Sequence, residues 1–262
     1  MTHPKDHVTA CAASETRPKL IVVGSGMAAT RTIEHLLTIA PDRYDISIYG
    51  AEPHPNYNRI LLSPVLAGEM SMSDIVLNDH TWYQQRGIAL HTGVQIIAID
   101  RIHREVVTVD GTRERYDRLL LATGSMPFKL RVPGVELAGV ITYRDIADTE
   151  AMIDASQSQG RAVVIGGGLL GLEAANGLRA RGMDVTVLHV MPWLMERQLD
   201  RTAAGLLQQT LEARGIRFML GAQTASIAGV GGKVASVTLA TGETLTTDLV
   251  VMAVGIRPNV SL

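Results

Sequence analysis

Residues 19–29 read KLIVVGSGMAA, and this stretch decides the fold. The run KLIVV is apolar and rich in β-branched residues, which is typical of a buried parallel strand, and it ends at Gly24. Apolar residues then recur at helical spacing over 28–38, and DISIY at 45–49 reads as a second strand. A strand, a glycine turn, a helix and a strand in this order predict a βαβ unit.

The same order of features returns later in the chain. RAVVI at 161–165 predicts a strand, GGGLLG at 166–171 a turn, residues 172–181 a helix and residues 184–188 a second strand. The two units start 142 residues apart, from Gly24 to Gly166 (166 minus 24). This recurrence indicates a duplication.

The ends of the two halves are also alike. LLLATGSMP at 119–127 closes the first half and VVMAVGIRP at 250–258 closes the second. β-rich stretches near 96–109 and 224–239 precede these closing strands and predict antiparallel hairpins or meanders. The sequence therefore predicts an α/β fold of two tandem Rossmann-like dinucleotide-binding domains, in three layers with an inserted antiparallel β-meander.

Both glycine loops contain the residue types that a dinucleotide pyrophosphate requires. Residues 24–29 follow G-x-G-x-x-A and residues 166–171 the full G-x-G-x-x-G. The first glycine allows the tight turn, the second lets the backbone approach the phosphates, and the small third residue lets helix and strand pack closely. The helix N-terminus adds N–H donors and the positive end of a dipole.

An acidic residue beyond the second strand binds the ribose in this motif. Glu52 stands 28 residues after Gly24 (52 minus 24) and can accept hydrogen bonds from a ribose; the alternative is a solvated loop carboxylate. The second unit has no such acid, because its strand runs into His189 and Val190. The choice between NADH and NADPH therefore stays open, and His189 is either a nucleotide contact or an ordinary strand-end histidine.

Composition excludes several other classes of protein. The 262 residues are 46% hydrophobic and 4% aromatic with a formal net charge of −2, so we expect neither a disordered chain nor a nucleic-acid-binding protein. No uncharged apolar run reaches the roughly 18 to 20 residues of a membrane span, and residues 1–18 do not resemble a secretory signal. The expected location is the cytoplasm, with no membrane partner.

Metal and thiol chemistry are not expected either. The single cysteine, Cys11, cannot by itself form an internal disulfide, a cysteine-based zinc site or an iron–sulfur cluster. The histidines lack metal-ligand spacing, so we predict no metal site. The alternating charges of residues 113–118 read as a solvated turn.

Two dinucleotide folds in tandem, closed by A-T-G and by A-x-G-x-R-P, resemble the pyridine nucleotide-disulfide oxidoreductase superfamily over residues 19–259. In that superfamily the first unit binds FAD and the second binds NAD(P)H. Residues 57–63 (YNRILLS) and 189–200 (HVMPWLMERQLD) further resemble the N-terminal part of the large subunit of assimilatory NAD(P)H-dependent nitrite reductases. Electron-transfer subunits of nitrate reductases are similar.

The resemblance implies a set of cofactor contacts. Those to FAD are Gly24, Gly26, Met27, Ala28, Glu52, Arg59, the backbone of Ile96, Thr123 and Gly124. Those to NAD(P)H are Gly166, Gly168, Leu169, Leu170, Gly171, His189 and Gly255. Glu173 stands where relatives place a glutamate near the nicotinamide and flavin rings; the alternative is a helix-face carboxylate. Pro64 occupies the position at which some ferredoxin-reducing relatives have a lysine, so their Lys–Glu pair is absent.

The sequence pattern and the resemblance together imply a division of the chain. We expect a disordered tail at 1–18, an incomplete FAD-binding domain at 19–127, a linker at 128–144, an NAD(P)-binding domain at 145–257, and at 258–262 the start of the return to the FAD domain. The family's second FAD segment and, in nitrite reductase, the iron–sulfur and siroheme parts would follow Leu262, so the chain is expected to be truncated at its C-terminus.

The expected activity is that of an FAD-dependent NAD(P)H oxidoreductase module. Hydride transfer to a flavin needs little acid–base help, so we assign no catalytic side chain. Residues 19–262 contain no cysteine, so electrons are expected to leave the flavin directly. The acceptor is either a metal centre, on iron–sulfur and siroheme domains or on a small redox partner, or a small molecule such as oxygen, and the expected setting is the reduction of nitrite to ammonia. The alternatives are a stand-alone reductase of a ferredoxin-like partner and a non-catalytic dinucleotide-binding fragment; a homodimer is compatible with each.

Overall fold

The computed structural model describes residues 17–262, so Cys11 and most of the expected tail lie outside the described residues. The chain forms two compact units. The first contains the described residues up to Pro55, residues His80–Ala122 and Leu262, and the second contains Asn56–Asp79 and Thr123–Ser261. Each unit has its own parallel sheet.

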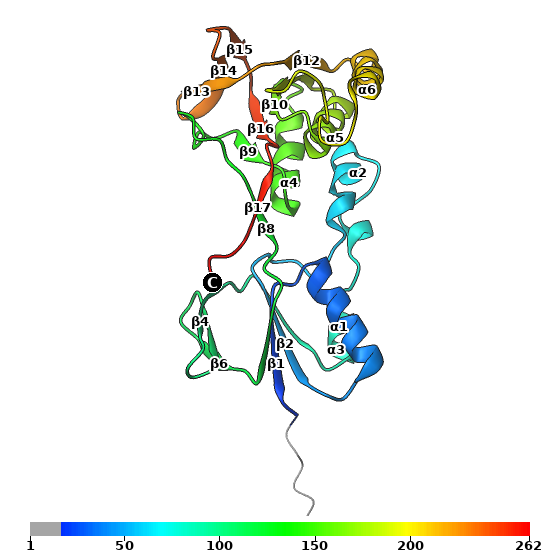
Figure 1. Ribbon diagram of the computed structural model, residues 1–262, viewed down its shortest axis with the longest axis vertical. Coiled ribbons are helices and arrows are strands. Elements are labelled where there is room, and N and C mark those ends of the chain that lie inside the picture. Colours follow the sequence, from blue (N-terminus) through cyan, green and yellow to red (C-terminus); the bar gives the residue numbers. More distant parts are fainter. Residues whose placement is uncertain (1–16) are drawn as a thin grey trace, which may run out of the picture. The chain divides into compact units, whose positions relative to one another are not determined.

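The first unit is built on a four-stranded parallel sheet in the order β3-β2-β1-β7. Its strands are β1 (Lys19–Val23), β2 (Asp45–Gly50), β3 (Ala89–Thr92) and β7 (Arg118–Leu121), and its helices are α1 (Met27–Ile39) and α3 (His80–Gln85). Leu20 and Val22 pack with Ile33 of α1 and Tyr83 of α3. Figure 1 shows both helices on one side of this sheet. The βαβ unit predicted from residues 19–49 is confirmed, because its strands and helix are specified locally.

The other side of this sheet is covered by a separate three-stranded meander. It consists of β4 (Ile96–Asp100), β5 (Glu105–Thr108) and β6 (Arg113–Arg115). Ile21 and Val23 pack against Ile96 and Val106 of the meander, which gives the unit the three layers expected.

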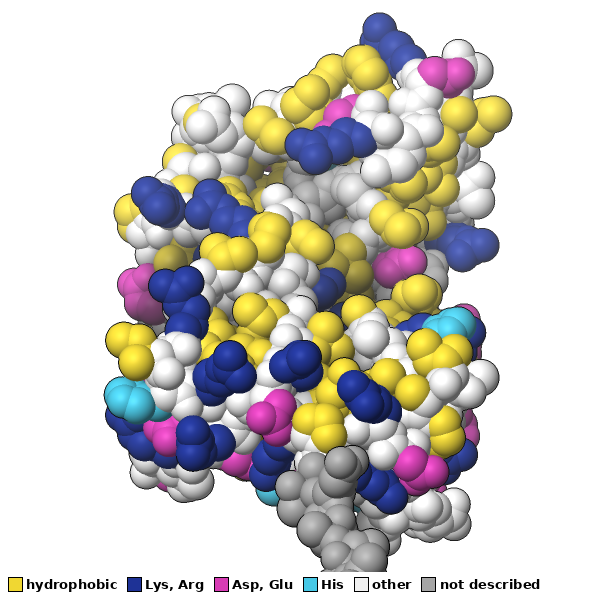
Figure 2. All heavy atoms as spheres, turned by 60° about the horizontal axis from the view of Figure 1, so that its bottom comes forward, with side chains coloured by type: hydrophobic (Ala, Val, Ile, Leu, Met, Phe, Trp, Pro, Cys, Tyr) yellow, Lys and Arg dark blue, Asp and Glu magenta, His cyan; other side chains and the backbone are white. Residues whose placement is uncertain are grey.

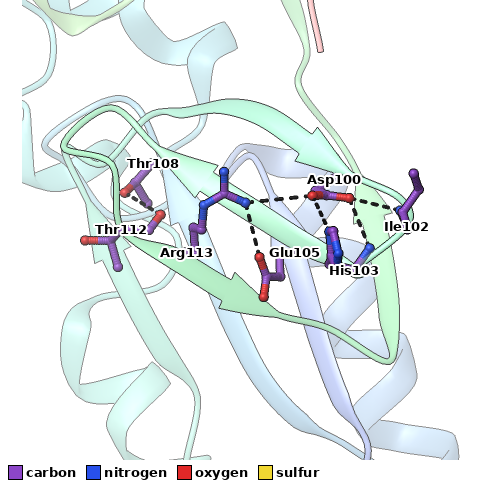
Figure 3. A network of polar contacts seen from close by, with 7 residues as sticks. All are labelled: Asp100, Ile102, His103, Glu105, Thr108, Thr112 and Arg113. Carbon is purple, nitrogen blue, oxygen red and sulfur yellow. Dashed lines mark hydrogen bonds and ion pairs between the residues drawn. The ribbon is translucent and has the colours of Figure 1, made fainter.

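A polar network fixes the turn between β4 and β5 (Figure 3). Asp100 Oδ1 accepts the backbone N–H groups of Ile102 and His103 at 3.0 Å each, and its Oδ2 lies 2.7 Å from His103 Nδ1. These hydrogen bonds lower the pKa of Asp100 to about 2, and the bond from the His103 backbone N–H has the largest effect. Arg113 Nη1 of β6 lies 3.3 Å from Glu105 Oε2 of the central strand β5 and 3.8 Å from Asp100 Oδ2 of β4, and so links the three strands.

The expectation of a solvated turn at 113–118 is wrong. Arg113–Arg115 forms β6 and Arg118 begins β7. Alternation of charge has a period of two, which is also the period of side chains in a strand. Glu114 therefore points to the face opposite Arg113, where its carboxylate pairs with Lys19 and accepts a hydrogen bond from Ser47 at 3.4 Å.

The second unit repeats the plan with a five-stranded parallel sheet in the order β12-β11-β10-β16-β9. The strands are β9 (Val140–Thr142), β10 (Arg161–Ile165), β11 (Asp184–His189), β12 (Arg217–Leu220) and β16 (Leu249–Met252), and the helices are α4 (Ile146–Ser156), α5 (Leu169–Ala180) and α6 (Arg201–Ala213). The helix expected at 172–181 thus begins three residues earlier, directly after Gly168.

A second meander covers one face of this sheet. It contains β13 (Thr224–Val230), β14 (Lys233–Leu239) and β15 (Thr244–Thr246). Ile227 and Val237 of the meander pack on Val163 and Val250 of the sheet, while α4 and α5 bury the opposite face. Figure 1 shows these two layers on either side of β10 and β16.

Residues 123–127 and 258–261, which were expected in the FAD-binding domain and in the return to it, belong to the second unit. The compact units also differ from the expected division at two longer segments. First, β9 lies inside the segment 128–144 that was expected to be a linker, and it pairs in parallel with β16 as the edge strand of the second sheet. Second, residues 56–79, expected within the FAD-binding domain, belong to the second unit. This segment contains the short helices η1 (Arg59–Leu61), α2 (Leu62–Ala67) and η2 (Ser73–Ile75).

Packing of α2 against α5 explains the second difference. A Cβ added to Gly177 of α5 would lie 2.7 Å from Leu66 Cγ, so the glycine makes room for this leucine. Arg181 donates hydrogen bonds to the carbonyl oxygens of Leu66 and, at 3.2 Å, of Val65, which caps the end of α2. Leu66 and Leu178 are fully buried in one core cluster.

The two closing motifs meet in a small antiparallel sheet within the second unit. β8 (Ser125–Pro127) pairs with β17 (Ile256–Pro258), so Pro258, expected at the start of a return segment, belongs to a strand. The Arg257 guanidinium carbon lies 4.4 Å from the centre of the Phe128 ring.

Two properties of the molecule bear on function. Among residues 17–262 no helix combines the length and the apolarity needed to cross a membrane. Figure 2 shows Lys and Arg side chains interspersed with Asp and Glu on the face drawn.

Candidate functional site: two dinucleotide cradles

The first glycine loop joins β1 to α1 at the carboxyl end of the first sheet. Gly24 has φ +108°, a conformation that favours glycine, and its N–H donates to the Tyr49 carbonyl of β2 at 2.8 Å. Gly26 is the N-cap of α1, and no described side chain hydrogen-bonds to this cap. A Cβ on Gly26 would meet no heavy atom of the described residues within 4 Å, so the space above the helix N-terminus is open.

The second glycine loop repeats this geometry between β10 and α5. Gly166 has φ +123°, and its N–H donates to the Leu188 carbonyl of β11 at 2.8 Å. A Cβ on Gly166 would collide with the Ala253 carbonyl, and one on Gly171 would collide with the Gly166 carbonyl. Gly171 is therefore the close-packing glycine of the motif, as expected.

The helix end that this loop forms is suited to an anion. Around Gly168, the N-cap of α5, a Cβ would meet nothing within 4 Å in the part of the chain that the structure describes. The first turn of α5 carries no acidic residue, and Leu169 is exposed there. Open space over uncapped N–H groups, without a competing carboxylate, fits a pyrophosphate. Both loops thus fit the dinucleotides expected of them.

The first unit holds six of the nine residues expected to contact FAD, namely Gly24, Gly26, Met27, Ala28, Glu52 and Ile96. Glu52 follows β2 at the carboxyl edge of the sheet, and its backbone carbonyl accepts the Gly93 N–H at 2.9 Å. Ile96 opens β4 with its side chain in the core, so only its backbone can face a ligand.

Arg59, Thr123 and Gly124, the other three, belong to the second unit, where protein groups hold all of them. The Arg59 guanidinium donates to the Arg144 carbonyl and lies over the Tyr57 ring, 5.1 Å from its centre. The Thr123 hydroxyl donates to the Asn259 carbonyl at 2.7 Å, and the Gly124 carbonyl accepts the Asn259 N–H at 3.0 Å.

Glu173 of α5 is the end of a hydrogen-bonded chain. Ser63 Oγ donates to Glu173 Oε2 at 2.7 Å and lies 3.0 Å from the Tyr143 hydroxyl. Because Ser63 gives its only proton to the carboxylate, Tyr143 is the donor to Ser63. Burial raises the pKa of Tyr143 to about 12, so this hydroxyl keeps its proton at neutral pH.

Sequence reasoning did not assign Ser63 or Tyr143 to the site. Ser63 stands in the quoted YNRILLS motif, next to the position of the missing lysine, and that signal could have found it. Tyr143 has no comparable signal, because it lies 80 residues away in the chain from the serine it contacts.

His189 ends β11 beside the second glycine loop, and both ring nitrogens have partners in the protein. Nδ1 accepts the Gly167 N–H at 3.1 Å, and Nε2 lies 3.1 Å from Glu196 Oε2. The side chain is only 8% exposed. Gly255, with φ +116°, follows β16, and its carbonyl accepts the Phe128 N–H at 2.8 Å.

Comparison with known proteins agrees with this geometry. The family model of the pyridine nucleotide-disulphide oxidoreductases matches residues 18–262. The chain is 51% identical to a nitrite reductase [NAD(P)H] of Bacillus subtilis over 94% of this chain and 30% of that protein. It is 46% identical to the assimilatory nitrate reductase electron transfer subunit of the same organism, over 94% of this chain and 32% of that one.

Solved structures show the same likeness. A ferredoxin reductase from Rhodopseudomonas palustris superposes with a TM-score of 0.86 at 29% identity, over 93% of this chain and 60% of that one. The chain spans about a third of the length of the two Bacillus subtilis relatives. Two glycine cradles of one geometry and a family match over nearly all of the described residues lead to one conclusion: the chain belongs to the pyridine nucleotide-disulphide oxidoreductase family.

Proposed function

We propose that this chain is the electron-input module of a nitrite reductase of the NAD(P)H-dependent, assimilatory type. The observation that carries the proposal is the occurrence in one chain of two glycine loops that share the same backbone hydrogen bond and the same open helix N-terminus. The first loop would hold FAD and the second NAD(P)H. FAD, when bound, accepts a hydride from a nicotinamide and releases electrons to a further acceptor.

The residues of the chain would bind and orient the two dinucleotides. The N–H groups at the starts of α1 and α5 would bind the pyrophosphates, and Glu52 would accept hydrogen bonds from a ribose. In the second unit, Ser63 and Tyr143 hold the Glu173 carboxylate in one orientation. No described side chain has to exchange a proton in this scheme.

The sequence also favours one kind of electron acceptor. Disulfide reductases of the superfamily relay electrons through cysteines, whereas residues 19–262 contain none. Electrons would therefore leave the flavin without a thiol relay, toward iron–sulfur and siroheme centres. The names of the relatives with 51% and 46% identity support nitrite reduction and nitrate assimilation as the setting.

A stand-alone reductase of a small iron–sulfur protein is the second candidate. It is favoured by the likeness to a ferredoxin reductase at a TM-score of 0.86. Pro64 in place of the lysine of some ferredoxin-reducing relatives counts against it.

Absorbance spectroscopy of the purified chain tests the proposal. We expect a yellow protein after incubation with FAD, bleaching on anaerobic addition of NADH or NADPH, and reoxidation by the one-electron acceptor ferricyanide but not by a small disulfide. A protein that stays colourless with FAD, or a flavin that neither nucleotide bleaches, would refute the proposal. Rapid reoxidation by an added ferredoxin with no partner domains present would favour the second candidate.

A further inference from the structure

The loop between β11 and α6 folds back onto the second glycine loop. The Met195 N–H donates to the Gly167 carbonyl at 3.0 Å, and Leu194 is fully buried. A Cβ on Gly167 would lie 2.7 Å from His189 Cγ and 2.8 Å from Leu194 Cδ2. Gly167 is the variable residue between the first two glycines of the motif. His189 and Leu194 occupy the space that a side chain would need here, so only glycine fits.

These contacts also fix the proton of His189. The Gly167 backbone amide can only donate, so Nδ1 is the acceptor and the ring proton lies on Nε2. Nε2 therefore donates to the Glu196 carboxylate at 3.1 Å. With one nitrogen on the glycine loop and the other on Glu196, the ring has no nitrogen left for a ribose hydroxyl.

Glu196 is placed where the motif lacks its acid. Through His189 its carboxylate is held at the carboxyl ends of β10 and β11, beside the Gly167 loop, and its side chain is 23% exposed. In doubly wound sheets the adenosine ribose of a dinucleotide lies in this crevice, and a carboxylate there accepts hydrogen bonds from the 2′-hydroxyl. Oε1 of Glu196 lies 4.0 Å from Nε of Arg197, whose side chain is 87% exposed.

We propose that Glu196 accepts hydrogen bonds from the adenosine ribose in place of a strand-end acid, and that His189 is the positioning residue that holds Glu196. The ligand is then a pyridine dinucleotide with a free 2′-hydroxyl, NADH. This inference rests on the proposed binding of a pyridine nucleotide by the second unit. A 2′-phosphate beside the carboxylate would be repelled, which disfavours NADPH.

Isothermal titration calorimetry of the FAD-loaded chain with NAD⁺ and with NADP⁺, which carry the same adenosine ribose as NADH and NADPH but cannot reduce the flavin, tests the assignment. The wild-type chain should bind NAD⁺ more tightly. Glu196→Gln should weaken NAD⁺ binding about tenfold, the effect of one hydrogen bond to a charged group, and should lower the ratio of the Kd for NADP⁺ to the Kd for NAD⁺ by at least that factor. His189→Gln should shift the ratio in the same direction.

Three further variants keep the test decisive. Glu212→Gln on α6, where the carboxylate accepts only from Gln208 among the described side chains at 2.7 Å, is the matched control and should leave the ratio unchanged. Arg197→Gln should also leave it unchanged. If thermal unfolding shows that Glu196→Gln does not fold, Glu196→Asp, which keeps the charge but shortens the reach, should weaken NAD⁺ binding without admitting NADP⁺.

Several outcomes would overturn the assignment. They are equal wild-type affinity for both nucleotides, a ratio unchanged in Glu196→Gln, or a ratio that moves in Arg197→Gln instead. In these cases NADH still binds and bleaches the flavin, so the proposed function stands. A wild-type chain that binds neither nucleotide would overturn both proposals.

Discussion

Replacing Gly168 by aspartate should separate nucleotide binding from folding. Gly168 has φ −83° and ψ 177°, which aspartate adopts without strain, and its Cβ would enter space free of any described atom within 4 Å. As an N-cap, aspartate is at least as good as glycine, by a few tenths of a kcal/mol. The variant should therefore unfold at the same temperature as the wild-type chain or slightly above it.

The same carboxylate would lie where a pyrophosphate has to bind. Two like charges about 5 Å apart at an effective dielectric constant near 20 repel by about 3 kcal/mol, which weakens binding by at least about a hundredfold. Calorimetric titration of the FAD-loaded chain with NAD⁺, which carries the same pyrophosphate and cannot reduce the flavin, and a thermal unfolding curve measure the two effects. Gly205→Asp on α6, also in open space, is the matched control. If Gly168→Asp binds NAD⁺ with a Kd within threefold of the wild-type value, the assignment of this loop is refuted.

Three other perturbations have defined outcomes. Gly26→Asp should fold normally but fail to retain FAD on gel filtration, and a yellow variant would contradict the first cradle. Gly177→Ala should lose about 1 to 3 kcal/mol in urea unfolding because its Cβ meets Leu66, and unchanged stability would show that this helix contact is loose. Folding raises the Tyr143 pKa from 10.0 to about 12. The contribution of Tyr143 to the free energy of unfolding is therefore complete below pH 10 and falls by about 2 to 3 kcal/mol as the pH rises toward 12. Tyr143→Phe should abolish that pH dependence in urea unfolding.

Most strands and helices of the fold could be predicted from local sequence. The strands at 19–23 and 161–165 have the predicted bounds, since a β-branched run that stops at a glycine needs no distant partner to be recognised. The membership of residues 56–79 in the second unit could not be predicted in this way. It depends on Leu66 fitting the gap at Gly177, and the two residues are 111 positions apart in the sequence (177 minus 66).

The candidate site likewise has residues that local sequence predicts and contacts that it does not predict. The glycines were found because the motif is local, and their φ values and open faces agree with their expected tasks. The partners of Glu173 and His189 were not found, because hydrogen bonds such as Tyr143 to Ser63 arise only when distant segments pack together. For His189 the partner Glu196 is only seven residues away, but a loop that folds back has no periodicity to reveal it.

The packing of α2 on α5 limits how the polypeptide can be divided. Leu62, Leu66 and Ile75 share one buried cluster with Leu178 and Val187, although the intervening residues 80–122 fold elsewhere. A gene fragment that starts at residue 123 would encode the second sheet without this part of its interior and would expose an apolar surface to water. The two units are therefore not consecutive pieces of chain, and a soluble second unit would have to be expressed with residues 56–79 joined to it.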